Sequence, residues 1–428
     1  MRTPALRRAL GKWDLTAIGV NQVIGSAVFL LPSQVAAQVG GWGPVAFLAV
    51  GLASLLVALC FAELGSRFEQ TGGSYLYARA AFGRFVAFEI GWMQWVARIT
   101  SQAGIANGIA LALGFYWPVL TGGAGRAAVI VAITLAIGSI NLLGIRPSAV
   151  VVNLLTIAKL LPLACFIGIG VWFVDAGALV PAGPVTVEQA SAAALLLVFA
   201  FGGYDVIGVP AGEATDPRRH VPFAFVATIL AVTAVMTLAH VVAAGTLPTL
   251  AASSTTLADA SAVFMGSAGA LLVSLGAVVS MAGNSFGSVL TGSRMLFAMA
   301  EHGDLPRWLA RVHPGYRTPS NAILCMTVVV LTLALSGSFV VLAAASGVAR
   351  LVIYTGTCAA ALRLRYMAPP PGAPAPFVAP GGPLVPVLAI LVSVAILAGA
   401  TWPQLLVGIA GLGAGGVLFL IKPGTTRP

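Results

Sequence analysis

The chain has 428 residues, of which 59% are hydrophobic and only 8% are charged. Soluble domains carry about 25% charged residues, so this composition excludes a string of soluble domains. The net charge of +10 does not indicate a nucleic-acid partner, because the basic residues lie in alternate loops between apolar segments, as they do in membrane proteins.

Apolar stretches of about 20 residues, each long enough to cross about 30 Å of hydrocarbon, recur along the whole chain. We predict about twelve membrane-spanning helices, at residues 15–39, 43–63, 85–113, 127–144, 149–174, 192–214, 221–244, 262–298, 320–337, 339–361, 384–401 and 404–421. The amphipathic stretch 68–85 predicts a short helix on the cytoplasmic face. A second short helix is expected in the outer loop 245–261.

The distribution of charge predicts the orientation of the chain in the membrane. Basic residues gather in the loops on the side of the N-terminus, whereas the opposite loops hold a single one, Arg126. The same opposite loops carry the acids Asp175, Glu188 and Asp259. By the positive-inside rule, both termini lie in the cytoplasm of a multi-pass protein of the cell (inner) membrane.

Two of the predicted helices are interrupted at mid-membrane depth. The first is broken by GSAVF, residues 25–29, and the sixth by FGGYD, residues 201–205, with a second break at Gly208 and Pro210. Backbone freed from helical pairing inside a bilayer is costly unless it lines a cavity or holds a ligand. Two such breaks at matching places in two halves of a chain indicate a transporter built from inverted repeats.

The first break has the polarity of a zwitterion site. Unwinding at Gly25, Ser26 and Ala27 leaves amide N–H groups at the positive end of the following half-helix, and these donors suit a carboxylate. The carbonyl group before the break, that of Ile24, is free to accept from an ammonium group. The alternative is that Gly and Ser here only allow close packing of helices.

The second break adds a charge. Asp205 lies near the middle of the membrane, where a carboxylate is expensive and usually functional. The alternative is an acid whose only role is a structural ion pair.

Five sequence blocks give the chain a resemblance to a known family, the amino acid–polyamine–organocation (APC) permeases, over most of its length. These blocks are GSAVFLLP (25–32), GGSYLYARAAFG (72–83), INLLGIRPSAVVVNLLTIAKLLPL (140–163), FAFGGYDVIGVPAGEATDPRRHVP (199–222) and SRMLFAMAEHGDLPRWLARVHPGYRTP (293–319). Each alone is weak, but their combination and order are specific.

The resemblance implies an all-α integral membrane protein with the LeuT-like 5+5 inverted-repeat transporter fold and discontinuous helices 1 and 6. The expected units are a cytoplasmic tail (1–14), the first five-helix repeat (15–175), the second, inverted repeat (192–366), a Pro-rich linker (367–383), helices 11 and 12 (384–421) and a cytoplasmic tail (422–428).

The resemblance also implies that substrate is held at the two broken helices. We expect its carboxylate on the amide groups around Ser26 and Ala27. Its ammonium group is expected on carbonyl groups near both breaks, those of Ile24, Phe199, Ala200 and Gly202. Gly25 and Gly203 complete the two breaks, and Phe201 or a neighbour is the expected aromatic lid. The family's second glycine in the first motif is Ala27 here, and its methyl group should narrow the pocket floor.

Lys159 is the only lysine inside a predicted span. In related transporters of this fold a sodium ion bridges the first and eighth helices near the fifth, and Lys159 resembles a replacement for that ion. This resemblance favours proton coupling or exchange over sodium symport, with Lys159 and Asp205 as the coupling residues. The alternative is a lysine that extends to the cytoplasmic edge of the membrane.

Arg98 and Arg350 fall near the centres of spans 3 and 10. Like charges so placed need acidic partners; Asp205 is the obvious one, and Glu89 is less central. The favoured interpretation is ion pairs that hold the bundle or a gate. The alternative is that one arginine meets a second carboxylate of the substrate.

Three further residues are candidates for the pocket or a gate. Asn284 and Gln102 are mid-span polar residues that either line the pocket or hold helices together by hydrogen bonds. Glu213 lies where the sixth span reaches the cytoplasm and resembles the family's inner-gate acid. Ion pairs at that place could close the inner path, and solvated charges are the alternative.

These features predict secondary active transport of amino acids by alternating access, proton-coupled or by exchange, and independent of sodium. The alternative within the fold is a permease or antiporter for polyamines, amines or other organic cations. An intramembrane enzyme or a channel is the distant alternative, since the four histidines form no ligand pair or catalytic motif. No cofactor, metal or nucleic-acid partner is expected, and the absence of GxxxxGK[ST] argues against ATP.

Overall fold

A computed structural model describes residues 6–114, 117–120, 122–253, 255–336, 339–367, 377–399 and 402–421. The predicted tails and Pro-rich linker therefore lie partly outside the described residues, at 1–5, 368–376 and 422–428. Within the described ranges the regular structure is entirely helical.

The α-helices are α1 (Lys12–Val23), α2 (Ala27–Val39), α3 (Gly43–Gly65), α4 (Ser74–Phe82), α5 (Arg84–Gly114), α6 (Gly123–Leu142), α7 (Ile145–Gly170), α8 (Val187–Phe201), α9 (Pro217–Thr246), α10 (Thr256–Glu301), α11 (Ser320–Ser336), α12 (Phe339–Tyr366), α13 (Leu384–Ala398) and α14 (Trp402–Ile421). The short 3₁₀ helices are η1 (Gly40–Trp42), η2 (Pro118–Leu120), η3 (Val171–Phe173), η4 (Ala176–Leu179), η5 (Tyr204–Val206), η6 (Val209–Glu213), η7 (Leu250–Ala252) and η8 (Arg307–Ala310).

The predicted interruptions are present in the backbone. The first apolar segment is divided into α1 and α2, and the sixth into α8, η5 and η6. Five stretches of the described residues are long and apolar enough to cross a membrane by length and composition, and four shorter apolar helices accompany them. The structure is thus that of a multi-helix membrane protein, and the count of twelve crossings stays a prediction.

Two predicted boundaries were wrong. The short surface helix is narrower than 68–85, because it begins at Ser74 after two glycines with positive φ, Gly72 and Gly73. The short helix expected in the outer loop 245–261 is present as η7, but the predicted end of that loop is too late, because α10 begins at Thr256. Gly266, at φ +64°, bends α10 and divides it into two arms, since glycine tolerates this backbone conformation.

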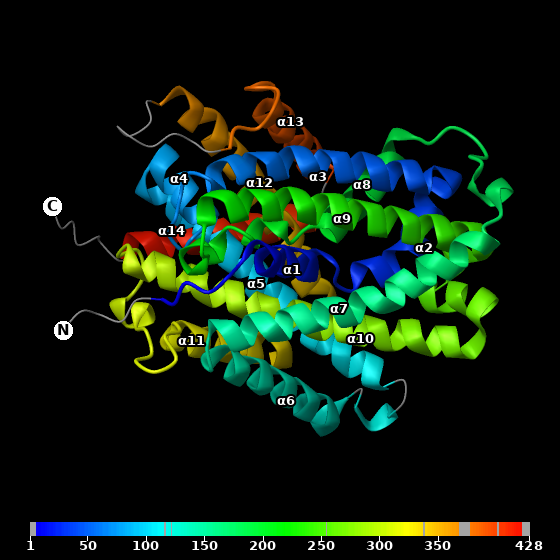
Figure 1. The fold of residues 1–428 in the computed structure, drawn as a ribbon, viewed down its shortest axis with the longest axis horizontal. Helices are drawn as coiled ribbons and strands as arrows, with labels where there is room; N and C mark the ends of the chain where they lie inside the picture. The colour runs from blue at the N-terminus through cyan, green and yellow to red at the C-terminus, as the bar shows by residue number, and fades with distance from the viewer. Residues whose placement is uncertain are drawn as a thin grey trace.

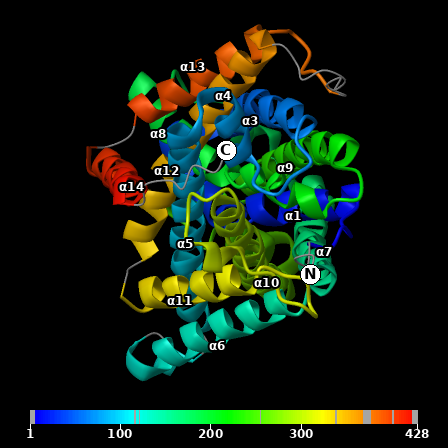
Figure 2. The same ribbon diagram turned by 90° about the vertical axis from the view of Figure 1, so that its left-hand side faces the viewer.

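The long helices run nearly parallel to the longest axis of the molecule (Figure 1). We call the end that carries α4, the start of α11 and the end of α14 the α4 end, and the end that carries η4 and η7 the opposite end. Seen from the α4 end, α1 is enclosed by α7, α9 and α10, whereas α6, α13 and α14 lie at the periphery (Figure 2). α1, the first half of the first broken segment, therefore lies in the interior of the bundle.

A buried acid fastens the end of α3 to the end of α12. The Glu63 carboxylate is fully buried and accepts hydrogen bonds from Arg365 and from Arg67. It also accepts from the backbone N–H of Ala379 at 3.0 Å, in the segment that leads to α13. This cluster holds the described start of the α13 segment against the rest of the bundle.

Candidate functional site

The break between α1 and α2 leaves unpaired backbone donors in the interior. α1 ends at Val23, Ile24 has the non-helical dihedrals φ −75° and ψ 84°, and α2 begins at Ala27. In the described part of the chain the amide N–H groups of Ser26, Ala27 and Val28 have no backbone acceptor. These donors mark the positive end of the α2 dipole, where an anion is favoured.

The carbonyl side of the same break is occupied by the protein's own groups. The Lys159 ammonium, fully buried on α7, donates to the carbonyl oxygens of Ile24 (2.6 Å) and Asn21 (3.0 Å). The Ser280 hydroxyl on α10 contacts the carbonyl oxygens of Ile24 and Gly25, at 2.9 Å each. Because a carbonyl oxygen has two lone pairs, the Ile24 carbonyl is fully engaged, and we no longer assign it to a substrate ammonium.

Lys159 therefore does not extend to the membrane edge. Its ammonium bridges α1 and α10 through backbone oxygens, with a third, longer contact to the Ser280 carbonyl (3.4 Å). A cation coordinated by carbonyl oxygens between these two helices is the arrangement expected of a bound sodium ion. Within the described ranges, no group of three or more His, Cys, Asp or Glu side chains could hold a metal.

The second break packs directly against the first. α8 ends at Phe201, and Gly203 adopts φ +127°, which L side chains rarely adopt. A Cβ atom on Gly203 would lie 2.5 Å from the Gln22 carbonyl oxygen, so the two backbones are in contact there. In the described residues the carbonyl groups of Ala200 and Phe201 receive no backbone donor. Free acceptors at the end of α8 thus complement the free donors of α2.

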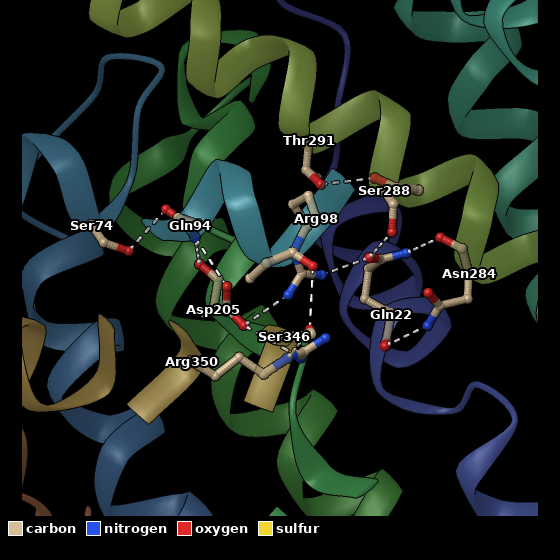
Figure 3. A network of polar contacts seen from close by, with 12 residues as sticks. Gln22, Ser74, Gln94, Arg98, Asp205, Asn284, Ser288, Thr291, Ser346 and Arg350 are labelled. Carbon is tan, nitrogen blue, oxygen red and sulfur yellow. Dashed lines mark hydrogen bonds and ion pairs between the residues drawn. The ribbon is translucent and has the colours of Figure 1, made fainter. Parts of the chain in front are cut away.

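A buried polar network joins the two breaks (Figure 3). Asp205 accepts a hydrogen bond from Gln94 Nε2 on α5 at 3.1 Å. Its Oδ1 atom lies 3.5 Å from Arg98 Nη2 and 4.0 Å from Arg350 Nη1. Arg98 Nη1 in turn donates to Gln22 Oε1 on α1 at 2.9 Å. The predicted pairing of both arginines with Asp205 is confirmed, and all three side chains are at most 5% exposed.

A small, partly open cavity lies between the breaks, and seven of the predicted site residues line it: Gly25, Ser26, Ala27, Ala200, Gly202, Asn284 and Arg350. Asn284 also donates from Nδ2 to the Gln22 carbonyl at 2.8 Å. The predicted gathering of these residues around one cavity is therefore what the structure describes.

Other predicted residues do not line this cavity: Ile24, Arg98, Gln102, Lys159, Phe201, Gly203, Asp205 and Glu213. Phe201 is fully buried and does not line the cavity, so an aromatic lid formed by Phe201 or a neighbour stays a prediction. The side chain of Phe199 lies outside the described residues. Glu89 contacts α14, where its Oε2 lies 2.7 Å from the Cβ position of Gly415, and has no ion pair with either arginine.

Sequence reasoning missed six cavity residues: Gln22, Val23, Ser101, Gly104, Ile105 and Ser346. Gln22 is a fully buried polar residue one turn before the first break, and that signal could have found it. Ser101, Gly104 and Ser346 are small residues of α5 and α12 whose orientation depends on how those helices pack.

Ion pairs close the α4 end. Glu213, after the second break, forms a fully buried, bidentate pair with Arg294 of α10. Asp304 accepts from Tyr75 (2.5 Å), Arg79 (2.8 Å) and Arg84 (2.5 Å), which ties α4 to the loop after α10. Burial, and then the hydrogen bond to Asp304, raise the pKa of Tyr75 above its ordinary value, so its hydroxyl remains a donor.

A helical membrane protein whose two interrupted helices meet at a small, partly open cavity lined by free backbone donors has the site architecture of a small-molecule transporter. The comparisons agree with this class. A family model for amino acid permeases matches residues 10–413, and the chain belongs to this family, within the APC superfamily. It is accordingly a permease and not an enzyme.

The names of similar proteins state several different substrates. The chain is 32% identical to the serine/threonine exchanger SteT of Bacillus subtilis, over 74% of each chain. It is 28% identical to the branched-chain amino acid permease BcaP of the same organism, over 97% of this chain and 93% of that one. A methylthioribose transporter from this organism is 28% identical, over 74% and 72%.

Proposed function

We propose that the protein is a secondary transporter of amino acids that works by alternating access through the LeuT-like 5+5 inverted-repeat fold with about twelve membrane-spanning helices. In this proposal residues 15–175 and 192–366 are the two repeats, helices 11 and 12 are peripheral, and the α4 end faces the cytoplasm together with both termini. The observation that carries the proposal is the cavity in which the free amide groups of α2 meet the free carbonyl groups of α8.

The substrate carboxylate is assigned to the amide groups of Ser26 and Ala27, where the α2 dipole favours negative charge. The ammonium group is assigned to the carbonyl groups at the end of α8, among them that of Ala200, and not to Ile24. A polyamine or another organic cation fits less well. It would leave the α2 amides without an anion and would face two buried arginines.

Lys159 is assigned the role of the coupling residue. Its ammonium already supplies the positive charge between α1 and α10, so a sodium ion would add a second charge at the same place. This favours proton coupling or exchange without sodium, with Lys159 and Asp205 changing partners during the cycle. The Glu213–Arg294 and Asp304 ion pairs are assigned to the cytoplasmic gate.

The test is uptake into proteoliposomes of the purified protein, driven in turn by a proton gradient, a sodium gradient and preloaded amino acid. The substrate is first found by a binding screen of all amino acids and common polyamines. We expect Lys159→Ala to abolish the pH dependence of uptake, while the exposed Arg311→Gln behaves as the unsubstituted chain. Unchanged pH dependence in Lys159→Ala, or a requirement for sodium, refutes the coupling assignment.

A further inference from the structure

One arginine of the polar network, Arg350, has an N–H group without a hydrogen-bond acceptor among the described residues. Arg350 is 4% exposed, and its Nε contacts the Ser346 hydroxyl at 3.4 Å. Its Nη1 atom is buried and has no hydrogen-bond partner, because Asp205 is 4.0 Å away. The same side chain lines the cavity. The guanidinium of this cavity-lining residue therefore has an N–H donor without an acceptor in the described part of the chain.

The local charge balance is positive. Asp205 is the one carboxylate paired with Arg98 and Arg350 among the described residues. Arg98 lies closer to it and is also bound by Gln22. Two guanidinium groups thus share one carboxylate in a buried site, which leaves the cluster with one net positive charge, and an uncompensated buried charge is destabilising. A zwitterionic substrate adds no net charge and leaves this imbalance unchanged.

The backbone at the end of α8 lies close to the Arg350 side chain. A Cβ atom on Gly202 would lie 2.6 Å from Arg350 Nη1, so only glycine lets the guanidinium approach the end of α8. Ser101 and Gly104 of α5, both small, line the same cavity. Ser26 and Ala27, whose amide groups have no backbone acceptor among the described residues, line the same cavity. The lining therefore contains two kinds of anion-binding group.

We propose that Arg350 binds the side-chain carboxylate of an acidic amino acid whose α-carboxylate lies on the amides of Ser26 and Ala27. The proposal rests on the amino acid transport proposed above and names its substrate class. Arg350 is thereby a specificity-determining residue, and the structural pairing with Asp205 is left chiefly to Arg98. Guanidinium and carboxylate form strong, charge-assisted hydrogen bonds when desolvated.

The experiment compares isosteric pairs of ligands, aspartate with asparagine and glutamate with glutamine. Binding is measured on purified protein by calorimetry and uptake in proteoliposomes. We expect the unsubstituted chain to bind at least one acid about 10-fold or more tightly than its amide. Arg350→Gln should weaken binding of the acid by about 10- to 100-fold, as expected for a charged hydrogen bond, and change binding of the amide less than about 3-fold.

Two further variants keep the test decisive. Arg350→Lys keeps a positive charge but not the planar guanidinium, so it should keep part of the preference for the acid even if Arg350→Gln does not fold. Arg311→Gln, an exposed arginine at the α4 end, is the matched control and should retain the preference for the acid.

The outcomes separate this proposal from the one on which it rests. If no amino acid is bound or transported, the proposed function fails. If neutral amino acids are transported and acids are bound no better than their amides, only the present inference fails. Equal loss of both ligand classes in a folded Arg350→Gln protein also overturns it, since Arg350 would then serve the fold alone.

Discussion

The two helix breaks lie in contact, yet their freed backbone groups meet different partners. At the first break a lysine and a serine from α7 and α10 hold the carbonyl groups, and the amide groups remain open. At the second break Asp205 lies just beyond the unwound turn and is bound by side chains of α5 and α12. The first break is thus stabilised through backbone atoms and the second through an ion-pair network.

This difference shows that an interrupted helix can have two different roles. Backbone carbonyl groups carry no net charge. The Lys159 side chain, which they bind, can therefore leave when its ammonium group loses a proton. A carboxylate between two arginines is a fixed charge whose removal leaves buried cations. The first break is therefore suited to release of its cation, whereas the second holds an ion-pair network that can exchange partners but needs an acid between the arginines. The following substitutions test that contrast, from the largest expected effect to the smallest.

Asp205→Asn should have the largest effect, because it leaves both arginines without an anion. Breaking a buried ion pair costs about 3–5 kcal/mol, so we expect uptake to fall more than about 100-fold and thermal unfolding to shift clearly downward. The double variant Asp205→Asn with Arg98→Gln removes one charge of each sign and should recover part of the stability. Full activity in the single variant would show that the network does not need an acid between the arginines.

Gly203→Ala should come next, because it acts where the two breaks touch. The added Cβ would meet the Gln22 carbonyl oxygen at 2.5 Å and would also require alanine at φ +127°. Such strain costs about 1–3 kcal/mol, and we expect about a 10-fold loss of uptake. Gly168→Ala is the matched control, since a Cβ on that exposed glycine of α7 meets nothing within 4 Å. Equal behaviour of the two variants would contradict the contact.

Ser280→Ala tests the first break alone. It removes the hydroxyl that contacts the carbonyl oxygens of Ile24 and Gly25 and leaves Lys159 in place. A lost buried hydrogen bond costs about 1–3 kcal/mol, and we expect uptake to fall about 5- to 10-fold. Ser393→Ala on α13, whose hydroxyl bonds only within its own helix, should change uptake less than about 2-fold. If Ser280→Ala lowered uptake as much as Asp205→Asn does, the proposed difference between the two breaks would be wrong.

Arg218→Gln should have the smallest effect, because it breaks a partly exposed pair outside both breaks. Arg218 donates to Glu69 at 2.6 Å, with side chains 46% and 39% exposed. Such pairs contribute about 0–1 kcal/mol, so uptake should stay within about 2-fold. A large loss would instead place this pair in the cytoplasmic gate with Glu213 and Arg294.

Much of the fold was predictable because membrane helices are marked by long apolar runs that end at glycine, proline or charge. The same logic located both breaks and the pairing of Asp205 with Arg98 and Arg350, since buried like charges require an acid. The role of Gln94 was not predictable, because it depends on which face of α5 meets the second break. The prediction for Ile24 failed for a similar reason. The sequence shows a free carbonyl but not the lysine and serine that reach it from distant helices.

The contact between Gly203 and the Gln22 carbonyl has a mechanical consequence. With no room for a side chain between them, the broken segments cannot slide past each other or part without losing that fit. We expect the two breaks to rotate as one unit. The half-helices on either side of the breaks then move in opposite directions. A probe pair placed on α2 and η6 should then report opposite displacements at the two membrane faces from a single rotation.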